Sequence, residues 1–349
     1  MGVRHKLFLL KERIKNEFLV PVCRKSYFLS DLYYFLFSKE FSREHQKVLN
    51  GKFLHIKALK SQKPNIFHLR RQIHRLEKGL IMKNRRPVFA LDYIVDAVKN
   101  YRLVYYGMQN NEIAYDEGLL KWASGVIQYY FDQVEDHKTI VEARTIFHSI
   151  SHGFDISAEH VPYCRAKITP STVTFDDLFS LSRQRRSVRW YTDKPVSREL
   201  IEQAVRIASL SPSACNRQPF EFRVFDAEEL KNKVGSIPMG IRPFHQQIPV
   251  FVVLVGKLSA YLSERDRHVI YIDGGLAAMS FMLALETLGL SSVPINWPDM
   301  EKLEQRMEKT IMLDMDERPM MLIGVGYADP DGKIPFSQKK APNVIIKYN

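Results

Sequence analysis

The chain has 349 residues, of which 45% are hydrophobic and 26% charged, so its length fits two ordinary domains and its composition excludes a disordered or collagen-like protein. Its three cysteines form no C-x-x-C pair, which excludes a disulfide scaffold and a zinc ribbon, and we expect reduced thiols, no metal and a cytoplasmic location. No uninterrupted apolar run approaches the roughly 18–20 residues of a membrane-spanning helix, so we expect no transmembrane segment.

Positive charge is concentrated at the beginning of the chain. The net charge is +12, and the first ninety residues alone hold 21 Lys and Arg against 6 Asp and Glu. Such an end can contact nucleic acid, an anionic membrane surface or an acidic partner, or can be a solvated face. No zinc-finger spacing, RNP sequence or basic region with heptads accompanies the charge. We therefore expect no nucleic-acid partner, while peripheral contact with an anionic surface stays open.

Residues 1–170 have mostly helical patterns. Apolar residues recur every three or four positions in the stretches 91–101 and 119–134, which is the spacing of one helix face, and core packing explains both stripes best. The pattern ends between Pro162 and Ser171. This change predicts a mainly helical, basic N-terminal extension over residues 1–170 and a second domain over residues 171–349.

The second domain mixes helices with a few strands. The expected elements are a helix capped by Ser197, a strand around 222–225, a buried strand over 248–255, a small-residue helix over 272–288 that ends at Gly289, an extended segment over 293–297 and a last strand over 320–325. Because this order is not a regular βαβ series, we expect the α+β class. No G-x-G-x-x-G lies between a strand and a helix, which argues against a Rossmann site.

Three short segments of this domain carry chemistry. Residues 185–189, Arg-Arg-Ser-Val-Arg, offer forked, permanently charged donors that suit a phosphate and an electron-rich ring. Residues 211–220, Ser-Pro-Ser-Ala-Cys-Asn-Arg-Gln-Pro-Phe, put backbone and amide groups on a surface turn. Residues 273–278, Asp-Gly-Gly-Leu-Ala-Ala, begin a helix that can approach another backbone closely. Taken singly, an exposed basic turn, a loop and helix packing also explain them.

In this order and spacing, the segments resemble the FMN-dependent nitroreductase family, in a long form with an N-terminal helical extension. The family pattern is R-R-S-x-R, then A-P-S-x-x-N-x-Q-P-W, then a helix with D-x-x-x-A, a strand ending in G-Y and a basic residue before a proline. The resemblance covers about residues 175–346. It implies a central mixed sheet flanked by helices, bound FMN, NAD(P)H as the electron donor and a homodimer with FMN at its interface.

The resemblance also implies which residues contact FMN. The arginines of 185–189 and the two lysines near the C-terminus would hold the phosphate and the pyrimidine edge, 294–296 would lie over the ring, and 212–216 would reach it from the other subunit. The implied cofactor-binding residues are Arg185, Arg186, Ser187, Arg189, Pro212, Ser213, Ala214, Asn216, Pro294, Ile295, Asn296, Lys339 and Lys340.

Substrate contacts are expected at two places. The densely charged segment 68–80 is similar to one found in long members of the family, some of them associated with cell-surface polysaccharide synthesis. Trp297 stands where glycine is common in the family, so we expect it to narrow the pocket above the ring. The candidate substrate residues are His74, Arg75, Glu77, Lys78 and Trp297. For the first four, the alternative is a salt-bridged helix end that packs the extension onto the core.

The sequence thus favours an FMN-dependent oxidoreductase that passes a hydride between a donor, flavin N5 and an unidentified small-molecule acceptor, with cell-surface polysaccharide metabolism as one possible setting. Position and charge suffice for hydride transfer, so no general acid or base is named. The alternative is a flavin-fold protein without turnover that binds a ligand or partner through its basic extension.

Overall fold

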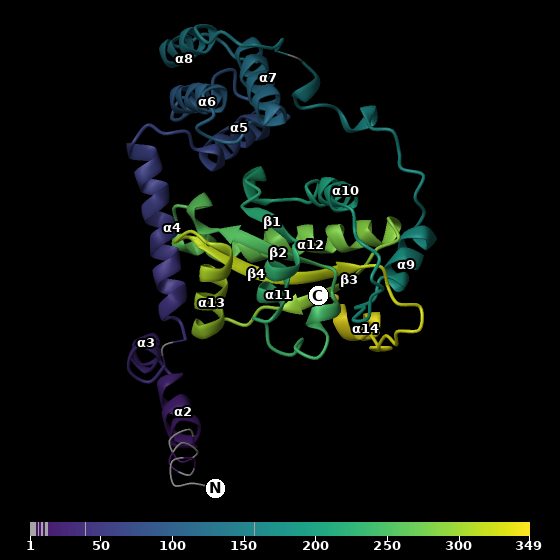
Figure 1. Ribbon diagram of the computed structural model, residues 1–349. Coiled ribbons are helices and arrows are strands. Elements are labelled where there is room, and N and C mark those ends of the chain that lie inside the picture. The colour runs from purple at the N-terminus through teal and green to yellow at the C-terminus, as the bar shows by residue number, and fades with distance from the viewer. Residues whose placement is uncertain (1–4, 6, 8–9, 11–12, 39, 157) are drawn as a thin grey trace.

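The computed structural model describes residues 5, 7, 10, 13–38, 40–156 and 158–349. The first elements with described bounds are a π-helical turn, η1 (Lys15–Leu19), and the helices α2 (Val20–Cys23), α3 (Tyr27–Leu36) and α4 (Ser42–Lys60). Figure 1 shows α2 and α3 below the body of the protein and α4 running along its side. α3 buries none of its residues, although its sequence is rich in Tyr, Phe and Leu.

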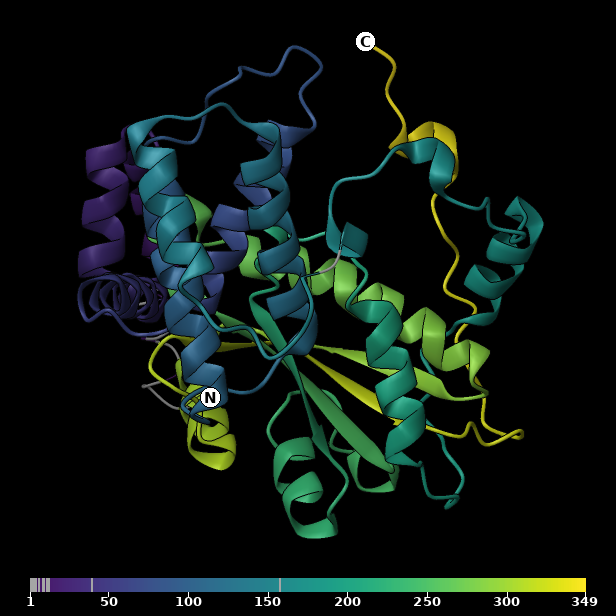
Figure 2. The ribbon, with the colours of Figure 1, turned by 90° about the horizontal axis from the view of Figure 1, so that it is seen from above.

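The next four helices form a bundle with its own core (Figures 1 and 2). They are α5 (Ile66–Leu80), α6 (Ile94–Gln109), α7 (Glu117–Gln133) and α8 (Lys138–His148). The apolar stripe predicted within 119–134 is buried as expected, because Leu120, Ala123 and Ile127 are fully inaccessible to solvent. α5, α7 and α8 begin at residues whose side chains accept a backbone N–H; for example, the Asp116 carboxylate accepts a hydrogen bond from the Leu119 N–H at the start of α7.

The second half of the chain is built on one antiparallel sheet. Its described strands are β1 (Phe220–Phe225), β2 (Val250–Lys257), β3 (Ser291–Asn296) and β4 (Glu317–Gly326), in the order β1-β2-β4-β3. This result confirms the α+β class. The parallel pairing among the described residues is a single bridge between Ser187 and Ser292, so the mixed character implied by the resemblance is confined to that bridge.

Helices cover both faces of the sheet (Figure 1). On one face lie α10 (Arg198–Ala208) and α12 (Val269–Thr287), packed on the even-numbered residues of β2. On the other face lie α11 (Glu228–Gly235) and α13 (Glu301–Ile311), packed on the odd-numbered ones. This alternation follows from the two-residue period of a strand, and it explains why the predicted apolar run 248–255 is buried on both sides.

α12 is the small-residue helix predicted over 272–288. It is followed by Gly289, whose φ of +75° is the left-handed conformation that glycine adopts without strain. By length and composition alone, Glu264–Thr287 could cross a membrane, but half of its most apolar window is buried inside the protein, as in a core helix.

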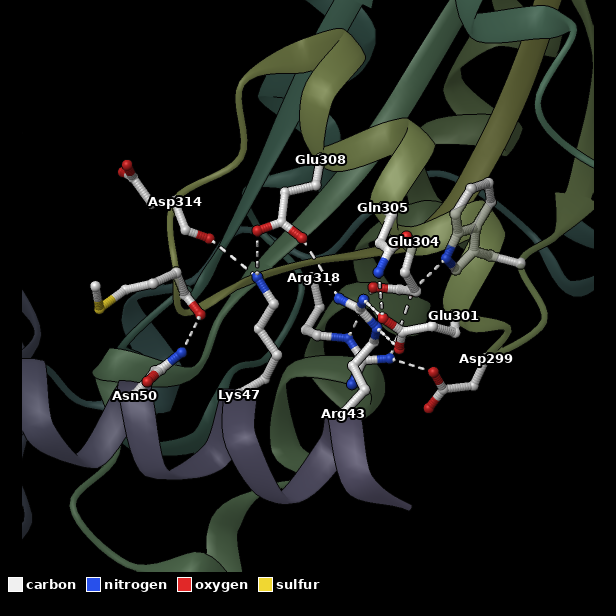
Figure 3. A network of polar contacts seen from close by, with 12 residues as sticks. Arg43, Lys47, Asn50, Asp299, Glu301, Glu304, Gln305, Glu308, Asp314 and Arg318 are labelled. Atoms are coloured by element: carbon white, nitrogen blue, oxygen red, sulfur yellow. Dashed lines mark hydrogen bonds and ion pairs between the residues drawn. The ribbon is translucent and has the colours of Figure 1, made fainter. Parts of the chain in front are cut away.

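α4 joins the N-terminal region to the sheet domain through charged contacts with α13 (Figure 3). The Arg43 guanidinium donates to the Glu301 carboxylate and lies 3.4 Å from Glu308, whereas the Lys47 ammonium lies 3.4 Å from Glu308 and from the Asp314 carbonyl oxygen. The side chains of Arg43 and Lys47 are 10% and 5% exposed, whereas those of Glu301 and Glu308 are 58% and 35% exposed, so solvent screens these contacts in part.

Close packing completes this joint. A Cβ on Gly51 of α4 would lie only 2.7 Å from the backbone carbon of Leu258, so a glycine is needed there. The Asn50 amide donates to the Met315 carbonyl oxygen (Figure 3). Although the boundary near residue 170 remains a prediction, α4 is therefore in contact with the second domain.

An exposed connection links the helical bundle to the sheet domain. Described residues 163–174 are exposed, and they lead to α9 (Phe175–Gln184), which buries none of its residues. The chain ends in an exposed tail after β4, with one short helix, α14 (Pro342–Ile345).

Candidate active site

A cavity of about 330 Å³ lies beside β3 and brings two of the predicted cofactor segments together. It is lined by Arg189, by residues 293–296 and by residues of the loop that follows α11. Within that loop Gly240 adopts φ +81°, a left-handed conformation that glycine adopts without strain. The cavity therefore combines a permanent positive charge with the edge of an apolar strand, a composition typical of ligand sites.

The backbone around Arg189 is held in place by several hydrogen bonds. The Val188 N–H donates to the Ser292 carbonyl oxygen (3.1 Å), and the Tyr191 hydroxyl donates to the Val188 carbonyl oxygen (2.8 Å). The Gln247 amide donates to the Arg189 carbonyl oxygen and accepts from the Tyr191 N–H. Burial raises the pKa of Tyr191, so its hydroxyl stays protonated and remains a donor.

The other members of the 185–189 segment lie outside the lining of this cavity. The Arg186 guanidinium donates to the carbonyl oxygens of Ser182 and Arg185, while Ser187 is held by its bridge to Ser292. Arg185 directly follows α9, and its Nε is buried without a hydrogen-bond partner among the described residues. An unpaired buried guanidinium N–H is a position that a phosphate oxygen would satisfy.

The turn at 211–218 is strained and is fixed by one carboxylate. Cys215, Asn216 and Gln218 all have positive φ angles near 50°, which is uncommon for residues other than glycine. The Asp273 carboxylate accepts hydrogen bonds from the Ser213 hydroxyl (2.6 Å) and the Ala214 N–H (3.0 Å). The predicted contacts Pro212, Ser213, Ala214 and Asn216 therefore lie together on a held turn, but none of them lines the Arg189 cavity of the same chain.

The two predicted phosphate-binding lysines lie on the C-terminal tail. Lys339 and Lys340 are exposed, and neither side chain has an ion pair with a described residue. The structure gives no contact between them and Arg185.

The predicted substrate residues of α5 are engaged within the helical bundle. His74 lies 3.5 Å from the Glu77 carboxylate, and that carboxylate also accepts from the Trp122 indole N–H (2.9 Å). The Arg75 guanidinium donates to Asp92 and lies 3.6 Å from the centre of the Tyr93 ring. Lys78 is exposed. These contacts match the alternative of a salt-bridged helix end rather than a substrate wall.

Trp297 is placed in the core rather than above a ring site. It is 9% exposed, its indole N–H donates to the Glu304 carboxylate (2.6 Å), and it does not line the Arg189 cavity. Glu304 also lies 3.5 Å from Arg318, and burial raises the pKa of Glu304 despite these partners. We therefore assign Trp297 a packing role and leave it out of the proposed site.

The sequence motifs miss the roles of two residues near the predicted turn. They identify Asp273 only as the beginning of a small-residue helix, yet its carboxylate fixes the turn. Arg217 lies inside the second motif without an expected role, yet it is only 9% exposed and stacks over Tyr261 at 4.7 Å. An acidic residue in an otherwise apolar helix is the signal that could have found Asp273.

Comparison with known proteins identifies the second domain. Residues 182–241 and 236–327 match the sequence model of the nitroreductase family. An iodotyrosine deiodinase of Thermotoga neapolitana is 27% identical over 198 residues, 49% of this chain and 97% of that protein. An FMN reductase [NAD(P)H] of Bacillus subtilis is 28% identical over 174 residues, 45% of this chain and 69% of that protein.

Among solved structures, an FMN-dependent nitroreductase from Clostridium difficile is 21% identical, covers 49% of this chain and 98% of its own, and has a TM-score of 0.43. On the sequence match, the second domain is a nitroreductase-family domain, and the predicted family is confirmed for that domain. The predicted nitroreductase-like α+β fold is confirmed with it.

Proposed function

We propose that the protein is an FMN-dependent oxidoreductase that takes electrons from NAD(P)H and passes them to a small-molecule acceptor. The observation that carries this proposal is the cavity in which Arg189 meets residues 293–296 within a nitroreductase-family domain. One of the relatives is an FMN reductase [NAD(P)H], which supports the choice of cofactor and donor.

The residues present fit an FMN molecule. Arg189 offers a fixed positive charge at the cavity, and this charge would stabilise the reduced, anionic pyrimidine edge. The unpaired Nε of Arg185 is available for a phosphate oxygen, with Lys339 or Lys340 and the Ser187 hydroxyl as further phosphate contacts, and Arg186 would contribute through its backbone. Pro294, Ile295 and Asn296 would support one face of the ring. When bound, FMN supplies the atom that accepts and returns the hydride.

We further propose a homodimer in which the turn of Pro212, Ser213, Ala214 and Asn216 completes the partner's cavity. This arrangement explains why the turn is rigid yet absent from the Arg189 cavity of its own chain. It also explains the exposed apolar side chains of two helices, namely Phe175, Leu178 and Phe179 on α9 and Ile272, Leu276 and Met279 on α12. Apolar surface of this kind is favourably buried against a second copy.

The identity of the physiological acceptor is a separate question from the cofactor and the donor. The relatives' names include deiodinases and an FMN reductase, so the family admits several acceptors. We propose a cytoplasmic location and a role in cell-surface polysaccharide metabolism. The resemblance of segment 68–80 to long members of the family supports this role.

Purification and reduction test the proposal. We expect a yellow protein with about one FMN per chain, bleached by dithionite and by NADH or NADPH, and an Arg189→Ala variant whose FMN content and nucleotide-driven reduction rate fall at least about tenfold. Arg86→Ala, which removes an exposed arginine of the helical region, is the matched control. Colourless wild-type protein that takes up no added FMN would contradict the proposal. Bleaching by dithionite but by neither nucleotide would favour the binding protein without turnover.

A further inference from the structure

The helical region contributes a positively charged surface next to the strained turn. α5 packs against the 214–216 turn. Arg71 of α5 and Arg217 of the turn are close enough that the charge of Arg217 acts to lower the pKa of Arg71, as Arg75 and Arg265 also do, whereas Cys215 of the turn acts to raise it. Residues far apart in the sequence thus place guanidinium groups together at this point.

Arg217 is a buried cation without a counter-ion among the described residues. It is 9% exposed, its guanidinium lies 4.7 Å from the centre of the Tyr261 ring, and its Nε is buried without a hydrogen-bond partner in the described part of the chain. Contact with the ring offsets part of the cost of burial, but it satisfies none of the N–H groups of the guanidinium. An ion or ligand with acceptor oxygens would do so.

Arg71 is half-buried and likewise has no ion pair with a described residue. Burial, followed by the charge of Arg217, lowers the pKa of Arg71 below its ordinary value. Arginine nevertheless stays charged near pH 7, so the two partly or fully buried cations repel each other. Such an arrangement is stabilised when an anion lies between them.

The other charged groups around this contact do not supply that anion. The Asp273 carboxylate is occupied by Ser213 and Ala214. Asp266 lies 3.8 Å from Arg265, and Asp92 accepts from Arg75. The His55 ring contacts the Ser259 carbonyl oxygen at 2.8 Å, and burial lowers its pKa, so it is neutral at pH 7.

We propose that Arg71 and Arg217 bind the anionic group, a carboxylate or phosphate, of the acceptor substrate. The inference rests on the proposed function, because there the 212–216 turn borders the partner's flavin and α5 lies directly beside that turn. The helical region thereby selects negatively charged acceptors, and it does so through Arg71 rather than through His74, Arg75, Glu77 or Lys78.

Calorimetric titration of the purified holoprotein with benzoate, and with benzamide as its neutral counterpart, tests the site directly. We expect benzoate to bind and benzamide to bind at least about tenfold more weakly, as for loss of a charge-assisted contact. In the Arg71→Gln variant, the affinity for benzoate should fall by a similar factor, while the FMN content stays that of wild type. Arg86→Gln, which removes an exposed arginine of the same region, should leave benzoate binding unchanged.

Steady-state kinetics show whether the anionic group that binds Arg71 and Arg217 belongs to the acceptor or to the nucleotide donor. In Arg71→Gln, the KM for 4-nitrobenzoate should rise about tenfold, whereas the KM for nitrobenzene should stay constant. A rise in the KM for NADPH without a change for NADH or 4-nitrobenzoate would assign the cations to the donor phosphate and overturn the proposal. Equal benzoate affinity in Arg71→Gln and wild type would also overturn it. Loss of FMN from wild-type protein would instead contradict the proposed function, and benzoate titration of that protein would still test Arg71.

Discussion

Buried polar atoms without partners mark the places where single residues matter most. The Nε of Arg185 and of Arg217 would each be satisfied by an anion, and the proposed site gives each of them one. Glu286 of α12 is different, because it is itself an acid. Its residue is 8% exposed, one carboxylate oxygen has no partner among the described residues, and the other accepts a 3.4 Å hydrogen bond from Gln184.

Glu286 should therefore make stability depend on pH. Burial raises its pKa, although the hydrogen bond from Gln184 and the charge of Arg185 act to lower it. The folded state thus binds this proton more tightly than the unfolded state, so stability is lost as the pH rises through the raised pKa. Glu286→Gln should raise the Tm at pH 8 by roughly 2–4 °C, on the order of 1 kcal/mol, and change it little at pH 4.

Scanning calorimetry at fixed ionic strength from pH 4 to pH 8 measures this difference. Glu202→Gln, at an exposed position on α10, should show no such pH dependence. A Glu286→Gln variant that is less stable than wild type at pH 8 would contradict the argument.

At this scale the sequence motifs identify residues that share a cavity. Arg189 and residues 294–296 line it together, because an ordered motif specifies neighbours in the fold, and their contact with FMN stays a prediction. Trp297 could have been placed correctly from strand alternation, since Val293, Ile295 and Trp297 share one face and pack in one core. Arg71 could not be identified, because its nearness to Arg217 depends on how two separate domains pack.

α4 is the element that joins the helical region to the sheet domain. The sequence predicts a mainly helical region over residues 1–170 without bounds for this helix. The partners of Arg43 lie more than 250 residues away, and no local pattern specifies its contact with Glu301. By contrast, the helices and strands that the sequence predicts in the sheet domain lie near their predicted positions, because apolar periodicity and turn residues act locally. The sequence gives no prediction for α9, α11 and α13.

Removing both cations should loosen this joint. Burial acts to lower the pKa of Arg43, but the hydrogen bond and charge of Glu301 raise it, so the ion pair stabilises the docked helix. Arg43→Ala/Lys47→Ala should lower the free energy of unfolding by about 1–3 kcal/mol and speed hydrogen exchange across α4.

Hydrogen exchange followed by mass spectrometry reports the second effect. Lys57→Ala/Lys60→Ala, which removes two exposed cations from the same helix, is the matched control. Unchanged exchange in α4 of the Arg43→Ala/Lys47→Ala variant would show that packing against Leu258 alone holds the helix.

On the scale of the whole molecule, exposed apolar surface is the dominant feature. In the sheet domain it covers α9, one side of α12 and the C-terminal tail, and in the N-terminal region it covers α2 and α3. A monomer that leaves such surface in water loses the free energy of burying it, at about 25 cal/mol per Å².

A charge placed on that surface should therefore abolish the dimer and FMN binding together. Leu276 is 43% exposed on α12, and Leu276→Asp would bury a carboxylate in the proposed interface. We expect a folded monomer with at least about tenfold less FMN, measured by light scattering, circular dichroism and absorbance. Val141→Asp, at a 44% exposed apolar position on α8, should remain dimeric and yellow. A dimeric Leu276→Asp variant that retains FMN would refute the proposed interface.

The route of the chain limits how the helical bundle can move. α4, which is anchored on α13, leads the chain into the helical bundle. Residues 163–174 lead the chain out of the bundle to α9, so two separate covalent connections tie the bundle to the sheet domain (Figures 1 and 2). A lid on a single hinge rotates freely about that hinge, whereas a body tethered at two distant points must deform one tether in order to swing. Molecules that enter or leave beside α5 consequently pass a wall of nearly constant position, and differences in turnover among them should reflect their fit to that wall rather than the rate of a gate.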